Sequence, residues 1–333
     1  MMPDARDLRR DFLIAEHPIA PVVRLDASAD AGIGPAAIAI GAFDGVHRAH
    51  AELIAAACAD ARKLGIASAV VTFDPDPDTV VAPRPAPKLM ATADRIDALS
   101  HLGVDYVVVV PFTRELAALD HEAFFACLAS VMDIKSIRVG SDFRLGRGGE
   151  ANVEVIHAWG EGHGIEVHAH DLILEGGEPI CSTRIRGRLA AGDVEGAAAL
   201  LGRAPMVRGR VAQGRGEGTG MGFPTANIEV APGLALPAEG VYEGLMLVDG
   251  SVWPAAVNVG LPPTFAERAA SAHLEANLIG FEGDIYGREV ALAFTRRLRP
   301  SRVFDSLDEL IATVEGNIED IRQNLGDTGV KIA

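Results

Sequence analysis

The 333-residue chain has few cysteines, and their spacing excludes two kinds of site. Cys58, Cys127 and Cys181 are its only cysteines, and no two of them form a Cys-x-x-Cys pair. A disulfide framework or a thiolate zinc site needs more cysteines at closer spacing. This usage fits a reducing cytosol, and we expect a cytoplasmic protein.

Basic residues and long apolar runs are also scarce. The chain has 30 Lys and Arg against 46 Asp and Glu, a formal net charge of −16. Nucleic-acid binding through phosphate contacts needs a positive net charge, so we expect no nucleic-acid partner. Any anionic nucleotide must be held by local hydrogen-bond donors and not by the overall charge of the protein. Residues 1–16 are charged and lack a signal-peptide core. No uncharged apolar run approaches the roughly 18 residues of a membrane span, so no membrane partner is expected.

The chain does have enough apolar residues to form two hydrophobic cores. Hydrophobic residues make up 49% of it, and its length predicts two domains. The first half alternates short apolar or β-branched runs with helix-forming segments. The strand-like runs are 36–40, 67–73, 104–111 and 137–140, and the helical segments are 51–64, 92–102 (with Thr92 as N-cap) and 121–132. Such alternation predicts a Rossmann-like α/β domain with a parallel sheet, whose ligands bind beyond the carboxyl ends of the strands.

The second half has the pattern of an all-β barrel or sandwich with a terminal helix. Strand-like segments are 207–211, 240–248, 253–259, 272–279 and 289–298. Asp249-Gly250 is the clearest hairpin signal. An amphipathic helix is expected over 306–325, with Ser306 as N-cap and Glu309 completing a capping box. A helical stretch over 183–201, broken near Gly192, connects the two halves.

The first motif runs from Gly41 to His50. Glycines follow a strand, and His47 and His50 then share one face at a helix start. Free N–H groups and the helix dipole favour anions there, and two imidazoles can donate to a phosphoryl oxygen. A zinc pair lacks a carboxylate or thiolate at standard spacing to complete it. Plain surface histidines at a helix start are the other alternative.

The second motif places two hydroxyls before two guanidinium groups. It comprises Ser182, Thr183, Arg184 and Arg186, at an expected helix start. Arginine forks match phosphate geometry. The alternative is a hydroxyl that only caps the helix, followed by solvated arginines.

The third motif is a run with glycine at every second position, followed by Gly222-Phe223-Pro224-Thr225-Ala226-Asn227. The glycines of the run are Gly214, Gly216, Gly218, Gly220 and Gly222. Such a backbone can approach a ligand closely, and a hydroxyl and a carboxamide two residues apart suit Mg²⁺. A plain surface turn is the alternative. Further on, Glu275 interrupts an apolar strand and is either a general base or an outward-facing strand residue.

Together these motifs resemble the bacterial bifunctional riboflavin kinase/FAD synthetase family. The resemblance covers about residues 36–325. It also includes Gly140 to Gly146, Gly192 to Glu195, Leu200 to Arg203, Leu236 to Tyr242, Asn258 to Gly260, Pro263 to Phe265, Asp284 to Gly287 and Phe304 to Leu307.

The resemblance implies two reactions on one chain. A riboflavin kinase would phosphorylate riboflavin to FMN with MgATP, and an FMN adenylyltransferase would convert FMN and ATP to FAD and pyrophosphate. The partners are thus small molecules, namely riboflavin, FMN and ATP, and the sequence does not indicate an oligomeric state. The implied domains are an adenylyltransferase over 1–186, a helical linker over 187–205 and a kinase barrel over 206–333.

The family pattern also assigns residues to these reactions. Glu275 is the implied kinase base and Thr225 and Asn227 the metal ligands, while His47 and His50 stabilise the adenylylation transition state. The implied nucleotide-binding residues are Gly41, Phe43, Asp44, Gly45, Ser182, Thr183, Arg184, Arg186, Gly214, Gly220, Gly222 and Pro224. The implied flavin-binding residues are Asp142, Asn258 and Thr264.

The chain departs from the family pattern at several positions. Ala42 and Ala49 replace Asn and Gly, Glu217 and Thr219 stand in a loop that usually carries arginines, and Asp76 stands where His is usual. A carboxylate about 4 Å from a phosphate costs roughly 4 kcal/mol at an effective dielectric near 20. Two alternatives follow: a divergent paralogue with kinase activity only or altered flavin or nucleotide specificity, and a flavin-binding regulator without turnover.

Overall fold

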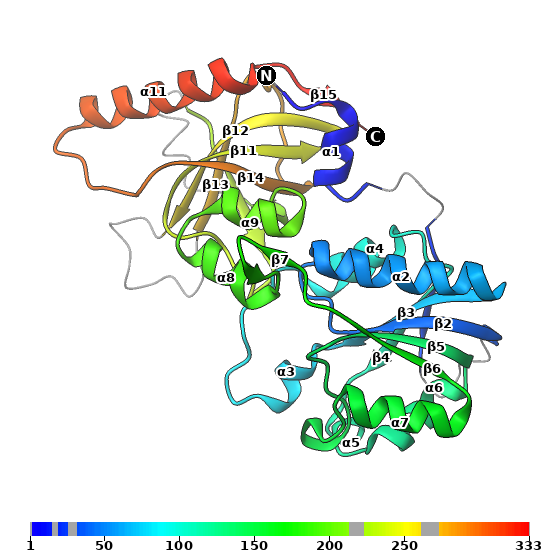
Figure 1. The fold of residues 1–333 in the computed structure, drawn as a ribbon. Coiled ribbons are helices and arrows are strands. Elements are labelled where there is room, and N and C mark those ends of the chain that lie inside the picture. The colour runs from blue at the N-terminus through cyan, green and yellow to red at the C-terminus, as the bar shows by residue number, and fades with distance from the viewer. Residues whose placement is uncertain (1, 15–18, 26–31, 213–222, 261–272, 333) are drawn as a thin grey trace. The chain divides into compact units, whose positions relative to one another are not determined.

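The structure is a computed structural model that describes residues 2–14, 19–25, 32–212, 223–260 and 273–332 (Figure 1). The chain forms two compact units. One comprises Ala15–Ser182, and the other combines Met1–Ile14 with Thr183–Ala333. Each unit is described by itself below.

The unit Ala15–Ser182 is built on a six-stranded parallel sheet. Its strands, in spatial order, are β1 (Val22–Arg24), β4 (Tyr106–Pro111), β3 (Ala67–Asp74), β2 (Pro35–Ile40), β5 (Asp133–Gly140) and β6 (Glu166–His170). Its longer helices are α2 (Arg48–Leu64), α4 (Thr92–Ser100), α6 (His121–Ala129) and α7 (Val153–His163), and the short α3 (Pro77–Val81) and α5 (Arg114–Ala117) follow β3 and β4. Figure 1 shows α2 and α4 on one face of the sheet and α6 and α7 on the other. The expected parallel α/β sheet is therefore confirmed.

Burial explains why the central strands read as unbroken apolar runs. Val107, Val108, Val109 and Val110 of β4 are all at most 1% exposed, although successive side chains point to opposite faces. Helices cover both faces, so no position on this strand needs a polar side chain.

The order of the strands places the loop motifs of this unit at one edge. From β2 the chain winds outward through β3 and β4, then returns to the other side of β2 with β5 and β6. Because all strands are parallel, the loops that begin at Gly41, Pro75 and Ser141 leave from the same, carboxyl edge. The divergence of the chain between β2 and β5 marks the usual ligand position of such sheets.

The second unit is a closed antiparallel barrel. Its strands are β9 (Met206–Ala212), β10 (Ala226–Val230), β11 (Gly240–Val248), β12 (Ser251–Gly260), β13 (His273–Leu278) and β14 (Glu289–Arg299). They pair in the order β11-β14-β9-β10-β13-β12, and β12 pairs again with β11, which closes the barrel. The strand β15 (Val330–Lys331) adds to the outside of β12. Of the two all-β architectures expected, the barrel is the one observed.

The connections confirm several local predictions and correct one. Asp249 and Gly250, with φ of 48° and 76°, form the two-residue hairpin between β11 and β12. The helix α11 (Leu307–Leu325) starts after Ser306, whose hydroxyl accepts a hydrogen bond from Glu309 N. The helix α4 begins one residue earlier than expected: Ala91 occupies its N-cap, and Thr92 is its first residue.

The helical stretch before the barrel packs with the barrel unit. It forms α8 (Ser182–Ala190) and α9 (Val194–Leu201), separated at Gly192, whose φ is 76°. Arg297 of β14 donates to Ala191 O at 3.0 Å and to Glu239 O at 3.1 Å, so one guanidinium group joins the end of α8 to the barrel. The predicted boundaries of a separate linker at 187–205 stay a prediction.

The N-terminal helix α1 (Ala5–Asp11) is a part of the barrel unit that nothing in the sequence indicated. Leu8 and Phe12 are both 0% exposed and share a core with Leu245, Ala293 and Ile321 (Figure 1). Arg208 of β9 donates to Phe12 O at 3.4 Å. Burial lowers the pKa of the Arg203 guanidinium to about 10, and the nearby Asp11 carboxylate opposes this shift. Residues 15–182 are therefore an insertion between two segments of the barrel unit.

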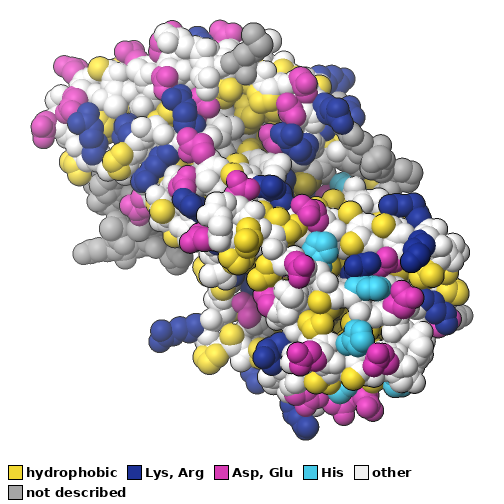
Figure 2. Space-filling model, viewed as in Figure 1, with side chains coloured by type: hydrophobic (Ala, Val, Ile, Leu, Met, Phe, Trp, Pro, Cys, Tyr) yellow, Lys and Arg dark blue, Asp and Glu magenta, His cyan; other side chains and the backbone are white. Residues whose placement is uncertain are grey.

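The face of the molecule shown in Figure 2 carries charged side chains of both signs. On the face shown in Figure 2, acidic and basic side chains of the described residues are interspersed. No basic stripe is visible among the described residues on this face.

Replacing Leu8 with Ala should destabilise the barrel unit and leave the other unit intact. Removing a fully buried leucine costs about 2–5 kcal/mol. The chain has two tryptophans, Trp159 in the inserted unit and Trp253 in the barrel unit, so Trp159→Phe and Trp253→Phe backgrounds report each unit separately by fluorescence during urea unfolding. The matched control is Leu307→Ala, because Leu307 is 58% exposed. An unchanged Trp253 transition in the Leu8→Ala variant would contradict the docking of α1.

Candidate active sites

The loop after β2 has an unusual backbone conformation, and one of its positions requires glycine. Phe43 and Val46 have φ of 55° and 42°, and Gly45 has φ of 84°. Non-glycine residues in this region are held there by surrounding structure and cluster at functional sites. A Cβ atom at Gly45 would lie 2.6 Å from Leu89 Cδ1, so both its conformation and its surroundings require glycine.

The two histidines of the first motif are brought together at the start of α2. His47 is the N-cap residue and only 3% exposed, and its Nδ1 accepts from His50 N at 3.3 Å. The two rings stack with centroids 3.5 Å apart, and His50 also meets the Phe43 ring edge-on at 5.2 Å. Because Nδ1 of His47 accepts a hydrogen bond, the proton of the neutral ring lies on Nε2. The paired face expected from the spacing is present.

The donor set near these histidines does not support the zinc alternative. In the part of the chain that the structure describes, no three His, Cys, Asp or Glu side chains are placed to hold a metal ion together. A zinc site needs three or four such ligands. The burial of His47, which is 3% exposed, also contradicts the alternative of plain surface histidines.

Asp44 and Ser182 meet at the same loop. Asp44 is 7% exposed, its Oδ1 accepts from Leu89 N at 2.8 Å, and its main-chain oxygen accepts from Ser182 Oγ at 2.8 Å. The Asp44 carboxylate thus holds the loop to a neighbouring segment, and the Ser182 hydroxyl fixes the end of its own segment to the loop. Ser182 and Asp44, 138 residues apart in the sequence, thus meet at this loop.

The other members of the second motif lie along α8. Thr183, Arg184 and Arg186 belong to the first turns of this helix, and Arg186 donates to Thr183 Oγ1 at 3.3 Å. Asp142, expected to bind flavin, is exposed in the turn after β5, at the carboxyl edge of the sheet.

In the barrel, strand register brings three predicted site residues into one row. Asn227 of β10 is directly opposite Glu275 of β13, and Glu275 is directly opposite Asn258 of β12. Directly paired residues point to the same face of a sheet. All three are half-buried, whereas Ala226, Ala276 and Val257, one position away on each strand, are buried.

This row lies on the outer face of the barrel. The next residue in it is Val241 of β11, opposite Asn258, and Glu243 and Leu245 follow on the same side of β11. Glu243 accepts from Asn324 of α11 at 2.8 Å, and Leu245 packs in a core with Ile321 of α11. The helix therefore covers the face that carries the row, at a position farther along the strands.

Asn277 is a site residue that sequence reasoning missed. Its side-chain amide donates to Pro224 O at 2.8 Å and so fastens the segment before Thr225 to β13. Asn277 lies two residues after Glu275 and thus on the same face. The alternation of polar residues in Leu274-Glu275-Ala276-Asn277-Leu278 was the signal in the sequence that could have identified Asn277.

Four of the predicted site residues, Gly214, Gly220, Gly222 and Thr264, lie outside the described residues.

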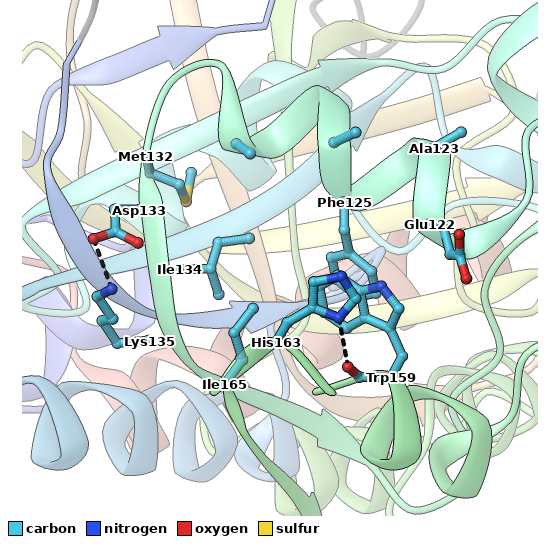
Figure 3. A pocket seen from close by; sticks show the side chains of 12 residues that line it. Glu122, Ala123, Phe125, Met132, Asp133, Ile134, Lys135, Trp159, His163 and Ile165 are labelled. Atoms are coloured by element: carbon cyan, nitrogen blue, oxygen red, sulfur yellow. Dashed lines mark hydrogen bonds and ion pairs between the residues drawn. The ribbon is translucent and has the colours of Figure 1, made fainter. Parts of the chain in front are cut away.

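A groove of about 680 Å³ between α6 and α7 is not part of either site (Figure 3). It is lined by the start of β5, including Asp133 and Lys135, and so lies at the amino edge of the sheet. Trp159 stacks with Phe125 of α6 at 4.2 Å and with His163 of its own helix at 4.6 Å. Figure 3 shows these three rings close together at the groove, and the Phe125–Trp159 pair joins α6 to α7.

The comparisons agree with this division of the molecule. Residues 31–184 match the family model for FAD synthetase, and residues 201–325 match that for riboflavin kinase. A bifunctional riboflavin kinase/FMN adenylyltransferase from Pseudomonas fluorescens is 34% identical over 280 residues, 84% of this chain and 89% of that protein. The chain belongs to this family.

Other relatives extend the agreement. The bifunctional riboflavin kinase/FMN adenylyltransferase of Bacillus subtilis is 32% identical over 281 residues, 84% of this chain and 89% of that protein. A crystal structure described as a macrolide-efflux protein from Streptococcus pneumoniae superimposes with a TM-score of 0.80 at 28% identity, over 90% of this chain and 98% of that one. Within the described residues of this riboflavin kinase/FMN adenylyltransferase family member, no helix is long and apolar enough to cross a membrane.

Replacing Gly45 with Ala should impair FMN adenylylation and leave riboflavin phosphorylation unchanged. The new methyl group would displace Leu89 and the loop that carries His47, and a shift of about 1 Å can cost roughly a hundredfold in rate. Gly65→Ala is the matched control, because Gly65 has a φ of 68° but nothing within 4 Å of an added Cβ. Both reactions are followed by chromatography of the flavins. Equal effects of the two substitutions would show that the Leu89 contact does not matter.

Proposed function

We propose that the protein makes FMN from riboflavin and then FAD from FMN, consuming one ATP in each reaction. The observation that carries this proposal is that both family models match successive parts of one chain, and that its bifunctional relatives are covered over most of their length. A kinase-only paralogue or a flavin-binding regulator has no comparable support.

The barrel is the proposed kinase. The terminal ribityl hydroxyl of riboflavin attacks the γ-phosphorus of MgATP, the bond to the β,γ-bridging oxygen breaks, and FMN and ADP result. Glu275 receives the hydroxyl proton as general base. Its place between Asn227 and Asn258, on one face of the paired strands, supports this role. We assign Asn258 to flavin contact, as the family pattern implies, together with Thr264.

Thr225 and Asn227 are the proposed contacts to the magnesium ion that arrives with ATP. They offer a hydroxyl and a carboxamide oxygen, which are the hard ligands that Mg²⁺ accepts. Both side chains are half-buried at the start of β10, and their separation of two residues gives them one side of the chain. The ion neutralises phosphate charge in the reaction. The hydrogen bond from Asn277 to Pro224 O holds this pair in place. Pro224, Gly214, Gly220 and Gly222 are the proposed nucleotide contacts of the barrel.

The parallel-sheet unit is the proposed adenylyltransferase. A phosphate oxygen of FMN attacks the α-phosphorus of ATP, the bond to pyrophosphate breaks, and FAD forms. The stacked His47 and His50 donate hydrogen bonds to the phosphoryl oxygens and to the departing pyrophosphate, where negative charge develops in the transition state. The start of α2 adds the positive end of its helix dipole. Gly41, Phe43, Asp44 and Gly45 shape this loop, and Ser182, Thr183, Arg184 and Arg186 are the proposed phosphate contacts, with Asp142 on the flavin.

We place these activities in the cytoplasm. Cys58, Cys127 and Cys181 are free thiols. Free thiols are ordinary in a reducing compartment and unusual in secreted proteins. ATP, the substrate of both reactions, is also a cytoplasmic metabolite.

The two reactions are separable by one substitution. With riboflavin and MgATP the protein should form FMN and FAD, and with FMN and MgATP it should form FAD. Glu275→Gln should lower riboflavin phosphorylation by about 10²–10⁴-fold, since general-base catalysis contributes that much, and should leave adenylylation of supplied FMN unchanged.

The matched control is Glu229→Gln on the neighbouring strand β10. Glu229 is exposed, so both activities should be retained. Undiminished phosphorylation in Glu275→Gln would remove Glu275 from the mechanism. Absence of FAD from supplied FMN in the unsubstituted protein would remove the second activity.

A further inference from the structure

Asp76 is buried, although its loop leaves the carboxyl edge of the sheet beside the loop of His47. Asp76 is 4% exposed, and its carboxylate pairs with the guanidinium of Arg95, a residue of α4 that is 0% exposed. The ammonium of Lys88 lies 3.9 Å from the other carboxylate oxygen. The carboxylate therefore points at two cations of its own unit, and its negative charge is compensated there.

Arg95 connects this loop to the sheet. Its Nη2 donates to Phe73 O at 2.5 Å, at the end of β3, while its Nη1 pairs with Asp76. A buried guanidinium is stable only when charged and polar groups surround it. Asp76 and Phe73 O supply them, so the start of the loop and the end of β3 are held in one arrangement.

Lys88 extends the network to residues 86–90, which we call the strap. Lys88 pairs with Asp78 as well as Asp76, and Ala86 N donates to Asp78 Oδ2 at 3.1 Å. Burial acts to raise the pKa of Asp78, but the hydrogen bonds from Lys88, Ala86 and Thr79 together with the charge of Lys88 lower that pKa. The strap is thus bound to the loop after β3 through two carboxylates.

The strap in turn shapes the nucleotide loop. Leu89 N donates to the buried Asp44 Oδ1 at 2.8 Å, and the Leu89 side chain fills the space beside Gly45. Both contacts lie within three residues of His47. A continuous set of contacts therefore leads from Arg95 through Asp76, Lys88 and Leu89 to the loop that carries the stacked histidines.

We propose that Asp76 is a positioning residue for FMN adenylylation. With Arg95 and Lys88 it holds the strap against Asp44 and Gly45, and so fixes the conformation of the loop Gly41–His47. The proposal rests on the adenylylation proposed above. It replaces the electrostatic hindrance considered from the sequence, in which the Asp76 carboxylate repels a triphosphate. Such hindrance would make Asp76→His raise FAD formation.

The first test is Asp76→Asn, which keeps the shape of the side chain and removes its charge. We expect adenylylation of FMN to fall roughly tenfold to a hundredfold, the effect of a small displacement of reacting groups. Riboflavin phosphorylation in the same sample should be unchanged. Asp133→Asn is the matched control, because it breaks an exposed pair with Lys135 at the opposite edge of the sheet and should alter neither reaction.

The second test is Lys88→Met, which keeps the Asp76–Arg95 pair and therefore avoids an uncompensated buried guanidinium. It decides the question if Asp76→Asn does not fold. We expect slower adenylylation, and faster hydrogen exchange at the Leu89 amide while the amides of β3 keep their protection. Because the side chain at position 88 also changes the intrinsic exchange rate of the Leu89 amide, protection factors are compared, and a purely local change would leave the protection factor of Leu89 unaltered.

The outcomes are distinct. Undiminished adenylylation in folded Asp76→Asn or in Lys88→Met overturns the proposal, and so does an increase of FAD formation in Asp76→His. If the unsubstituted protein forms no FAD, the proposed function fails. The exchange rate at Leu89 still tests the strap in that case, because it needs no substrate.

Discussion

The hydrogen-bond register between neighbouring strands decides which side chains of this protein meet. In the barrel, one register places Asn227, Glu275 and Asn258 side by side, although they come from three strands spread over the second half of the chain. A slip of one residue in any of these strands would turn its polar side chain to the barrel interior, among Ala276 and Val257. In the other unit, the parallel register makes the loops that contain Gly45, Asp76 and Asp142 leave one edge. Both proposed sites thus depend on strand pairing before they depend on any side chain.

Register also explains how far the sequence predicts the structure. Local signals sufficed where the cause is local: Asp249-Gly250 forms the expected hairpin because positive φ is cheap for these residues, and Ser306 caps α11. The buried runs of Val107 to Val110 could be recognised because helices cover both faces of β4. The row of Asn227, Glu275 and Asn258 could not be derived from periodicity, because pairing partners are set by barrel closure. Only the family resemblance named these residues together.

What sequence reasoning missed shares one physical character: it depends on contacts between distant segments. The helix α1 has an ordinary capped sequence, with Asp4 accepting from Arg6 N and Asp7 N, and nothing in it says which surface buries Leu8. Its docking gives the barrel unit a discontinuous chain and makes the inserted unit tethered at both ends. The Asn277–Pro224 hydrogen bond is similar, since it joins residues 53 apart. Thr92 is a different kind of miss. Its residue type is favoured at an N-cap, but α4 begins one position earlier than expected, so that Ala91 occupies the N-cap.

Asp76 shows how an apparent conflict with substrate charge is resolved by burial. An aspartate facing a triphosphate through solvent would act as a whole negative charge. In the structure Asp76 and Asp78 alternate with Arg95 and Lys88, so the cluster has two charges of each sign. At a distance, the field of this cluster is that of opposed dipoles, which falls off faster than the field of one charge. The repulsion energy of about 4 kcal/mol, estimated for a carboxylate in direct contact with a phosphate, therefore does not apply. The same pairing makes the site sensitive to loss of either partner, because desolvated Arg95 has no access to water. A carboxylate at this position is therefore compatible with nucleotide chemistry only together with the buried arginine, and the two must be considered as one unit.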